Sequence, residues 1–243
     1  MKILCVIPSR LQSTRLPRKP LLPIRGKPMI QWVYESAARC ALLSDVIVAT
    51  DSSEIADIIT RIGGKVAITD PDLPTGSERV AAVAEHYPEM DIIINLQGDE
   101  PFVKPAMLEA LVAPYLAGET PEMTTLALPL DMNHRYPDPG TVKVITDLKG
   151  NALYFSRAPI PYFRAETPVP VYHHMGLYAF RRDFLMHYKT LPQTPLEKAE
   201  LLEQLRVLEH GYQIRVCLST GKTLEINTRE EYEQAQQFEC EVE

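Results

Sequence analysis

The first chemical signal in the sequence is a concentration of positive charge near the N-terminus. Between Ser9 and Lys27 there are six basic residues and no acidic one: Arg10, Arg15, Arg18, Lys19, Arg25 and Lys27. Arginine offers a planar fork to phosphate oxygens and lysine a compact point charge. Ser13 and Thr14 add hydroxyl and backbone N–H donors. The stretch predicts a polyanion site, most simply for a triphosphate; the alternative is a solvated loop whose basic residues pair with surface carboxylates.

Glycine-based phosphate loops do not account for this basic stretch. The chain contains neither G-x-x-x-x-G-K-[ST] nor G-x-G-x-x-G. A Walker loop and a dinucleotide fingerprint are therefore both excluded. An anionic partner must be bound by the local cluster of basic side chains.

The best candidate for a metal ligand is Asp99, in the segment Gln97–Pro101. This segment directly follows an apolar run that is typical of a buried strand. A carboxylate beside a triphosphate suggests Mg²⁺, which usually binds one or two carboxylates together with phosphate oxygens. The alternative interpretation is an ordinary turn, since Asp-Glu-Pro is common turn chemistry.

A polar loop, Thr75–Arg79, precedes a predicted helix. Gly76 permits a close approach of the backbone to a ligand, and Ser77 is a plausible residue for capping the helix. From the sequence alone, a capping motif and a ligand-binding loop are equally good interpretations.

The elements that must position these residues alternate between strands and helices through the first half. Continuous apolar runs predict buried strands at 2–8, 45–51, 65–68 and 91–96, and helical periodicity predicts helices at 28–38, 52–62, 77–86 and 105–116. This alternation predicts a doubly wound α/β sheet. Such sheets bind ligands beyond the carboxyl ends of their strands, which is where the basic stretch and Asp99 lie.

The second half is less regular. It predicts strands at 123–130, 142–146, 152–156, 174–180 and 213–218, helices at 194–210 and 228–238, and a proline-rich loop at 159–170. No composition shift marks a linker. We therefore expect one domain, 1–243, with a nucleotide-binding half over 1–120 and an extended second lobe over 121–243.

Composition excludes several classes of protein. Apolar residues make up 45% of the 243-residue chain and charged residues 23%, as in an ordinary globular protein. The net charge of −7 disfavours nucleic acid as a partner. No apolar run approaches the roughly 18 residues of a membrane span, and the N-terminus lacks the pattern of a signal peptide. The four cysteines are scattered, which fits a reducing cytoplasm.

Several segments carry a resemblance to a known family. They span nearly the whole chain: Ile7–Leu21, Gly26–Ile30, Ala49–Asp51, Thr75–Arg79, Asn95–Pro101, Ala152–Arg157 and Leu202–Arg206. The first segment resembles the signature of the sugar cytidylyltransferases and marks only the broader nucleotidyltransferase superfamily. Ala152–Arg157 and Leu202–Arg206 narrow the resemblance to the 3-deoxy-manno-octulosonate (Kdo) cytidylyltransferases.

The resemblance implies a fold and an activity. The fold would be a Rossmann-like, doubly wound mixed sheet of the nucleotide-sugar transferase type. The activity would be transfer of CMP from CTP to the anomeric hydroxyl of Kdo, an acidic eight-carbon sugar, giving CMP-Kdo and pyrophosphate for lipopolysaccharide or capsule synthesis. The resemblance further implies Mg²⁺ as cofactor and a homodimer formed through the second half.

The resemblance also assigns roles to individual residues. Catalytic roles fall to Lys19, Arg15 and Asp99. CTP-binding roles fall to Pro8, Arg10, Ser13, Arg15, Lys19, Thr75, Gly76, Ser77, Arg79 and Gln97. The sugar-binding residues would be Gln97, Arg157, His174, Glu203 and Gln204. For the last four the residues themselves say little, because a lone histidine is more often structural and charges on a helix usually face water.

One position departs from the family's pattern. The family usually has an aspartate, its second metal carboxylate, where this chain has Asn227. With Asp99, Asn227 is the predicted metal pair, but an amide removes a negative charge from the site. Weaker metal binding, a role for nearby Glu225 or a changed metal preference all remain open, as does a simple cap on the last helix.

Three rival functions remain open. The nearest is a cytidylyltransferase for another acidic sugar, such as a sialic acid or an amino-substituted Kdo. A glycosyltransferase with a similar nucleotide fold is less well supported, since no D-x-D turn follows an apolar strand. A catalytically silent nucleotide-binding protein is the third, and the departure at Asn227 keeps it open.

Overall fold

The computed structural model describes residues 1–13, 16–166, 169–221 and 223–238. The chain divides into two compact units. The first consists of residues 1–109 and the described part of 222–243, and the second of residues 110–221. The prediction had placed the division near 120 and assigned the C-terminal segment to the second half. In the structure that segment belongs to the first unit.

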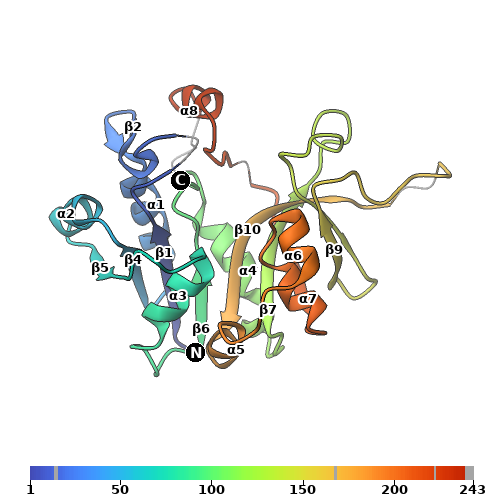
Figure 1. Cartoon of the computed structure of the whole chain (residues 1–243), viewed down its shortest axis with the longest axis horizontal. Coiled ribbons are helices and arrows are strands. Elements are labelled where there is room, and N and C mark those ends of the chain that lie inside the picture. The colour runs from blue at the N-terminus through green and yellow to red at the C-terminus, as the bar shows by residue number, and fades with distance from the viewer. Residues whose placement is uncertain (14–15, 167–168, 222, 239–243) are drawn as a thin grey trace. The chain divides into compact units, whose positions relative to one another are not determined.

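A parallel sheet forms the centre of the first unit (Figure 1). Its strands run in the order β6 (Ile92–Asn95), β1 (Ile3–Ser9), β4 (Asp45–Thr50) and β5 (Lys65–Ile68). Every residue of β1 is buried, as expected for a strand covered on both faces. The strand predictions for this half are confirmed to within a residue or two.

Helices cover this sheet and carry the chain between its strands. They are α1 (Met29–Ala38), α2 (Ser53–Arg61) and α3 (Gly76–Ala84). Helices α1 and α2 pack against each other and on β4, whereas α3 packs on β1 and β6. The side chain of Ser52 caps α2, and Thr75 with Glu78 forms a capping box on α3. Local capping chemistry therefore sets where α2 and α3 begin.

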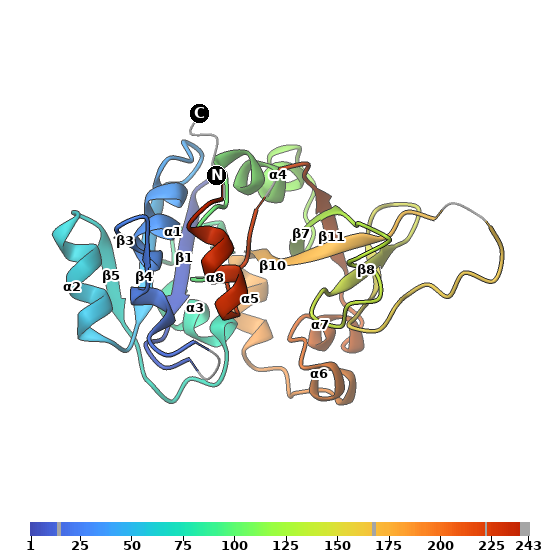
Figure 2. The same cartoon turned by 90° about the horizontal axis from the view of Figure 1, so that it is seen from above.

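A small apolar cluster joins the N-terminal loop to the C-terminal segment within the first unit. Its buried members are Leu16, Ile24, Met29, Phe102, Ile226 and Ala235. The residues of the cluster lie in or next to three elements. These are the 3₁₀ turn η1 (Lys19–Leu21), the hairpin of β2 (Pro23–Ile24) and β3 (Lys27–Pro28), and helix α8 (Arg229–Ala235). Figure 2 shows α8, which bonds to the hairpin through Tyr232 Oη and Pro23 O at 2.8 Å.

The second unit is built on a mixed sheet. Strand β7 (Met123–Pro129) lies between β11 (Ile214–Leu218), which is parallel to it, and β10 (Tyr172–Arg181), which is antiparallel. A hairpin of β8 (Lys143–Thr146) and β9 (Ala152–Ser156) pairs with β10. Helix α4 (Pro105–Leu116) carries the chain into this unit, which also holds α5 (Arg182–Tyr188), α6 (Pro195–Glu200) and α7 (Leu205–Glu209).

The long helix predicted over 194–210 is wrong. The chain forms α6 and α7 instead, because Leu201 adopts a left-handed conformation with φ 54° that ends α6. Leu201 is exposed rather than part of an apolar face. The prediction also missed α5. The α/β fold class is confirmed: the strands β6, β1, β4 and β5 of the first unit are parallel, whereas the strands of the second unit run in both directions.

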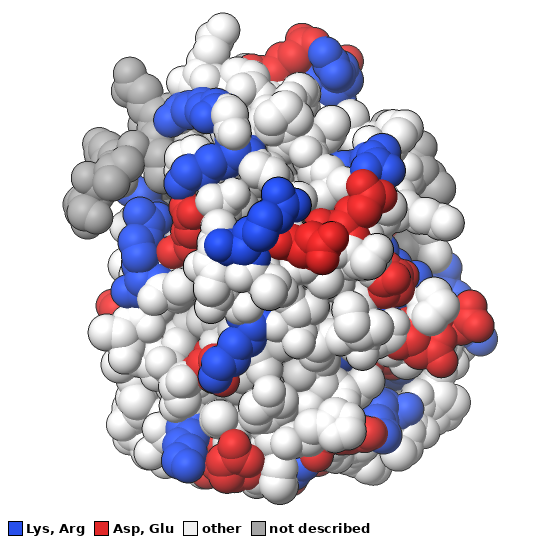
Figure 3. All heavy atoms as spheres, turned by 90° about the vertical axis from the view of Figure 1, so that its left-hand side faces the viewer, with Lys and Arg blue, Asp and Glu red and all other residues white. Residues whose placement is uncertain are grey.

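Two further observations concern surfaces. Among the described residues, no helix is both long and apolar enough to span a membrane. On the face shown in Figure 3, lysine and arginine side chains are interspersed with aspartate and glutamate rather than forming one basic surface.

Candidate active site

The predicted cation and anion groups meet in the first unit. The Lys19 ammonium donates to Asp99 Oδ2 at 2.7 Å and to Asn227 Oδ1 at 3.1 Å. These partners are 80 and 208 positions away from Lys19 in the sequence. The side chains of Lys19 and Asp99 are 15% and 20% exposed, so the ion pair is largely shielded yet reachable from solvent.

Local structure explains how three distant segments converge. Arg18 adopts a left-handed conformation, φ 57° and ψ 31°, that turns the chain into η1 at Lys19. Asp99 follows the end of β6, and its carbonyl accepts a hydrogen bond from Ile226 N at 3.1 Å. The apolar cluster holds Leu16, Phe102 and Ile226 together. Each of these apolar residues lies within three positions of a site residue. Their burial together therefore fixes the positions of Lys19, Asp99 and Asn227.

Two more carboxyl groups border this site. The Asn227 Nδ2 donates to Glu225 Oε1, and Thr223 Oγ1 donates to Glu100 Oε2 at 3.1 Å. Burial, followed by the charges of Glu225 and Asp99, raises the pKa of Glu100 well above its usual range. Glu225 is exposed as a residue, but its carboxyl group is partly desolvated; this desolvation, followed by the charge of Asp99, raises its pKa to about 7.

The residues at this site suit a hard divalent cation. Asp99 and Asn227 direct oxygen atoms at one positive group, here the Lys19 ammonium. Carboxylate and amide oxygens are the ligands that Mg²⁺ accepts. The described residues contain no group of three or more His, Cys, Asp or Glu side chains arranged to hold a metal. A cation here would therefore need oxygen ligands from another molecule, which a triphosphate provides.

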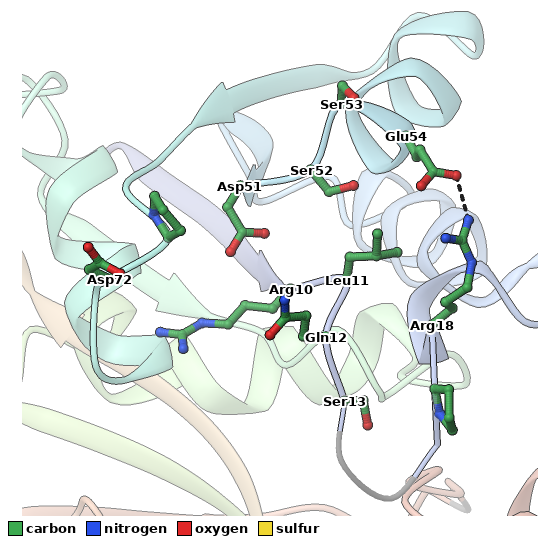
Figure 4. Close-up of a pocket in the computed structure, with 12 residues that line it drawn as sticks. Arg10, Leu11, Gln12, Ser13, Arg18, Asp51, Ser52, Ser53, Glu54 and Asp72 are labelled. Carbon is green, nitrogen blue, oxygen red and sulfur yellow. Dashed lines mark hydrogen bonds and ion pairs between the residues drawn. The ribbon is translucent and has the colours of Figure 1, made fainter.

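A pocket of about 1020 Å³ opens beyond the carboxyl ends of β1 and β4. Figure 4 shows Arg10, Gln12, Ser13 and Asp51 lining it, with the Arg10 side chain extended toward Asp72. The Nη2 atom of Arg10 is buried and has no hydrogen-bond partner among the described residues. An unpaired guanidinium nitrogen is costly, so it marks a place where a ligand acceptor would be favoured. Arg18, by contrast, is paired with Glu54 at 2.5 Å.

The predicted nucleotide residues of β1, α3 and the β6 end lie together. Gln97 Nε2 donates to Asn95 Oδ1 at 3.0 Å, and Asn95 Nδ2 donates to Ser77 Oγ at 3.1 Å. A side chain at Gly76 would meet Pro8 Cγ at 3.5 Å. A side chain at Gly98 would come within 3.0 Å of the Pro8 carbonyl, so glycine is needed where these two strand ends approach.

Other residues predicted to bind the nucleotide form hydrogen bonds within the protein. Thr75 uses its hydroxyl oxygen to cap α3, and Ser13 Oγ accepts from Leu16 N at 3.4 Å. The Arg79 side chain is fully buried and bonds to Thr69 and Asp51, which ties the ends of β4 and β5 together. This position gives Arg79 a structural part in the first unit. Arg15 and Thr14 lie outside the described residues.

The predicted sugar residues of the second unit are held by dense hydrogen bonding. Arg157 Nε donates to Glu200 O at 3.1 Å and its Nη1 to Pro139 O at 3.3 Å. Its backbone N–H donates to Glu200 Oε2 at 3.0 Å. Its carbonyl accepts from Lys143 Nζ at 2.5 Å. Arg157 is thus anchored on both backbone and side chain.

His174 belongs to a directional chain of neutral hydrogen bonds. Tyr178 Oη donates to Gln204 Oε1 at 3.0 Å, and Gln204 Nε2 lies 3.5 Å from His174 Nδ1. His174 Nε2 lies 2.9 Å from Thr125 Oγ1. Because the Thr125 hydroxyl donates its proton to Leu177 O, the proton of His174 must be on Nε2. Burial, followed by the charge of His173, lowers the pKa of His174 to about 3, so the ring is neutral.

Glu203 and Gln204 lie in the connection between α6 and α7 rather than on a helix face. Gln204 is buried and Glu203 half-buried. Sequence reasoning missed Asn95, Thr125, Lys143 and Glu200, which join the predicted residues to the fold. A polar residue inside a predicted buried strand, as at Asn95 and Thr125, was the available signal, because such a group requires a partner.

The fold and these residues define an α/β protein whose candidate site lies at the ends of parallel strands. Comparison with known proteins narrows this class. The family model described as cytidylyltransferase matches residues 4–216. The chain is 57% identical over 238 residues to the 3-deoxy-manno-octulosonate cytidylyltransferase of Acaryochloris marina, covering 98% of this chain and 97% of the relative. It is 52% identical over 236 residues to the enzyme of that name from Synechococcus elongatus, covering 97% of both.

A solved structure gives the same result. It is described as CMP:2-keto-3-deoxy-manno-octonic acid synthetase complexed with CTP, and it matches with a TM-score of 0.92 and 40% identity over 98% of both chains. The chain belongs to the 3-deoxy-manno-octulosonate cytidylyltransferase family. The family expected from the sequence is confirmed.

Proposed function

We propose that this chain transfers CMP from CTP to the anomeric hydroxyl of Kdo. In this reaction the anomeric oxygen bonds to the α-phosphorus and loses its proton. The bond from that phosphorus to the bridging oxygen breaks, and pyrophosphate leaves. Little covalent chemistry falls to the protein, so positioning and neutralisation of charge should supply most of the rate enhancement.

The observation that carries this proposal is the 2.7 Å contact between Lys19 Nζ and Asp99 Oδ2. A triphosphate with a divalent cation needs a positive group for its oxygens and a carboxylate for its metal, side by side. Lys19 and Asp99 meet this need at the carboxyl edge of the sheet. In the proposed complex Lys19 leaves Asp99 for the β- and γ-phosphates, and Arg15 joins it there. Both then stabilise the departing pyrophosphate.

The pocket beyond β1 and β4 is the proposed site for the rest of the nucleotide. The unpaired Arg10 Nη2 would find an acceptor on the ligand. Pro8, Ser13, Gly76 and Ser77 would contribute backbone and hydroxyl groups around it. Arg79 would act on this loop through its buried bonds to Asp51 and Thr69 rather than through the ligand.

Mg²⁺ is the proposed cofactor, with Asp99 and Asn227 as its candidate protein ligands. When bound, it would neutralise phosphate charge and polarise the α-phosphorus. The protein residues bind and orient the nucleotide, and the Lys19 ammonium, once it has left Asp99, keeps positive charge beside the leaving group.

The second unit is the proposed source of sugar contacts. Kdo carries a carboxylate and several hydroxyls, so it needs one guanidinium and several neutral partners. Arg157 supplies the guanidinium, and the carbonyls of Glu200 and Pro139 orient it. Glu203 is accessible for a hydroxyl. The buried chain of His174 and Gln204 would set the shape of this surface.

The remaining proposals concern setting and assembly. We propose a homodimer formed through the second unit, which exposes large apolar side chains at Leu148, Leu153 and Tyr162. Free thiols at Cys5, Cys40 and Cys217 support a reducing cytoplasm as the location. The product would enter lipopolysaccharide or capsule synthesis.

A pyrophosphate-release assay tests the proposed reaction. Release should require CTP, Mg²⁺ and Kdo together, with each omitted in turn as the control. Faster release with a sialic acid or an amino-substituted Kdo would reassign the sugar. Binding of CTP without release for any of these sugars would contradict the proposed activity and favour a silent nucleotide-binding protein.

A further inference from the structure

Asn227 uses both ends of its amide group. Its Oδ1 accepts from Lys19 Nζ at 3.1 Å, and its Nδ2 donates to Glu225 Oε1. An ammonium can only donate and a carboxylate can only accept, so the amide can stand in just one orientation. Asn227 therefore links Glu225 to the Lys19–Asp99 pair.

A count of charges shows why the contact between Asn227 and Glu225 matters for a divalent cation. Asp99 carries one negative charge, Lys19 one positive charge and Asn227 none. Without a further carboxylate these three groups sum to zero and offer a divalent cation little net attraction. The resemblance found in the sequence implies a second carboxylate at the position of Asn227. In this chain Glu225 is the carboxylate that contacts the side chain of Asn227, whereas Glu231 accepts from the Asn227 backbone N–H at 2.6 Å and belongs to the capping box of α8.

Accessibility separates the two extra carboxyl groups of the site. Glu100 is 1% exposed. One of its oxygens accepts from Thr223, and Oε1 has no partner among the described residues. Glu225, in contrast, is exposed to solvent. An incoming cation carried by a nucleotide can therefore reach Glu225, whereas Glu100 lies beneath the surface of the site.

We propose that Glu225 supplies the second negative charge for the cation in this chain, and that Asn227 positions its carboxylate beside Asp99. This inference rests on the proposed function, because it assumes a nucleotide with a divalent cation at this site. The negative charge that the family usually carries at position 227 is thus restored two positions earlier. Asn227 acts as a positioning residue through its amide nitrogen.

The test measures CTP binding by calorimetry, with Mg²⁺ and separately with EDTA, and without sugar so that no turnover occurs. In Glu225→Gln we expect the affinity measured with Mg²⁺ to fall about tenfold, as for the loss of a group that supports a metal. In EDTA the affinity should stay equal or rise, because a negative charge near the triphosphate is gone. A merely structural role would lower both values.

A second variant and a matched control complete the design. Adding Asn227→Asp to Glu225→Gln should restore the Mg²⁺-dependent affinity to within about threefold of wild type. Glu230→Gln removes the same charge from exposed helix α8 and should change neither value. Titration of the CTP complex with Mn²⁺, followed by the electron paramagnetic resonance of the free ion, should rank the variants in the same order.

The outcomes separate the inference from the proposed function. If wild-type protein binds CTP more tightly with Mg²⁺ and Glu225→Gln does the same to an equal extent, the inference fails and the proposed function stands. Equal losses with Mg²⁺ and with EDTA would also overturn the inference. If the wild-type protein binds CTP under neither condition, both fail.

Discussion

The candidate nucleotide site of the first unit is built on charged groups, whereas the polar cluster of the second unit is built on neutral hydrogen bonds. The first presents an ion pair, Lys19 with Asp99, that remains reachable from solvent. The second contains the neutral chain from Tyr178 through Gln204 and His174 to Thr125, all of it buried. Full charges attract phosphates and cations over a distance, whereas neutral hydrogen bonds give direction and shape.

The difference also concerns what each region can rearrange. Lys19 can exchange Asp99 for a phosphate, because both groups are reachable from solvent and a phosphate oxygen would replace the carboxylate oxygen. His174 cannot turn without breaking its contacts with Thr125 and Gln204 in the interior, which is costly. The first region is therefore suited to exchange partners during a reaction. The second is suited to hold one shape.

The largest expected effect comes from the ion pair that anchors the second region. Arg206 and Glu197 form two hydrogen bonds, at 2.8 and 2.5 Å, with side chains only 1% and 5% exposed. Arg206→Met should lower the free energy of unfolding by about 3–5 kcal/mol, because it leaves the charged carboxylate of Glu197 buried without its cation. Urea denaturation measures this. The exposed pair Arg229–Glu233 is the control, since Arg229→Met should leave stability nearly unchanged. Equal losses of stability in Arg206→Met and Arg229→Met would contradict the claim that the buried ion pair holds the second region in one shape.

The next effect concerns the exchange of partners in the first region. Lys19→Ala should lower turnover about 10²–10³-fold, as loss of an electrostatic contact in the transition state does. Pyrophosphate release with CTP and Kdo measures it, on protein shown to be folded. Lys65→Ala removes an exposed lysine paired with Asp45 and serves as the control. Turnover of Lys19→Ala near that of wild type would end the assignment of Lys19.

A pH titration of stability tests the neutral character of the second region. Burial lowers the pKa of His173 to about 4 and of His174 to about 3. Below about pH 6.5 the unfolded chain takes up these protons and the folded chain does not. The free energy of unfolding should therefore fall as the pH falls from 6.5 toward 4, by up to about 1.4 kcal/mol per pH unit for each histidine. His174→Gln should flatten this slope. An unchanged slope would mean that His174 is not buried as a neutral ring.

The smallest effect sharpens the role of Thr75. Its side chain accepts from Glu78 N at 3.2 Å, and its own backbone N–H donates to Glu78 Oε2 at 3.3 Å. Thr75→Ala should lower the free energy of unfolding by about 1 kcal/mol, as for the loss of a helix cap. Thr75→Ser keeps the hydroxyl and should retain most of that stability. Equal losses in the two variants would contradict the capping role.

Local patterns in the sequence predicted most of the first unit. Continuous apolar runs marked its strands, because a strand buried on both faces has no polar positions to alternate with. The helix predicted from Ser52 is α2, which Ser52 caps. The cap predicted for α3, Ser77, is wrong, because Thr75 caps that helix and Ser77 lies inside it. The same logic failed over 194–210, where the periodicity is compatible with one helix but Leu201 breaks it with a left-handed backbone. No residue type there announces the break, since glycine is the usual signal and leucine is not.

By itself the sequence determined which residues carry charge, which strands are buried and where Asp99 and the basic stretch fall relative to strand ends. Only the tertiary structure decided that Lys19 contacts both Asp99 and Asn227. It also decided that Arg79 forms its hydrogen bonds with Asp51 and Thr69. The contact between Asn227 and Glu225 is likewise a result of the tertiary structure. The physical reason is the distance along the chain over which each kind of interaction acts. Propensity and capping act between neighbours in the chain, whereas a contact across 208 positions exists only after apolar side chains such as Leu16 and Ile226 have been buried together.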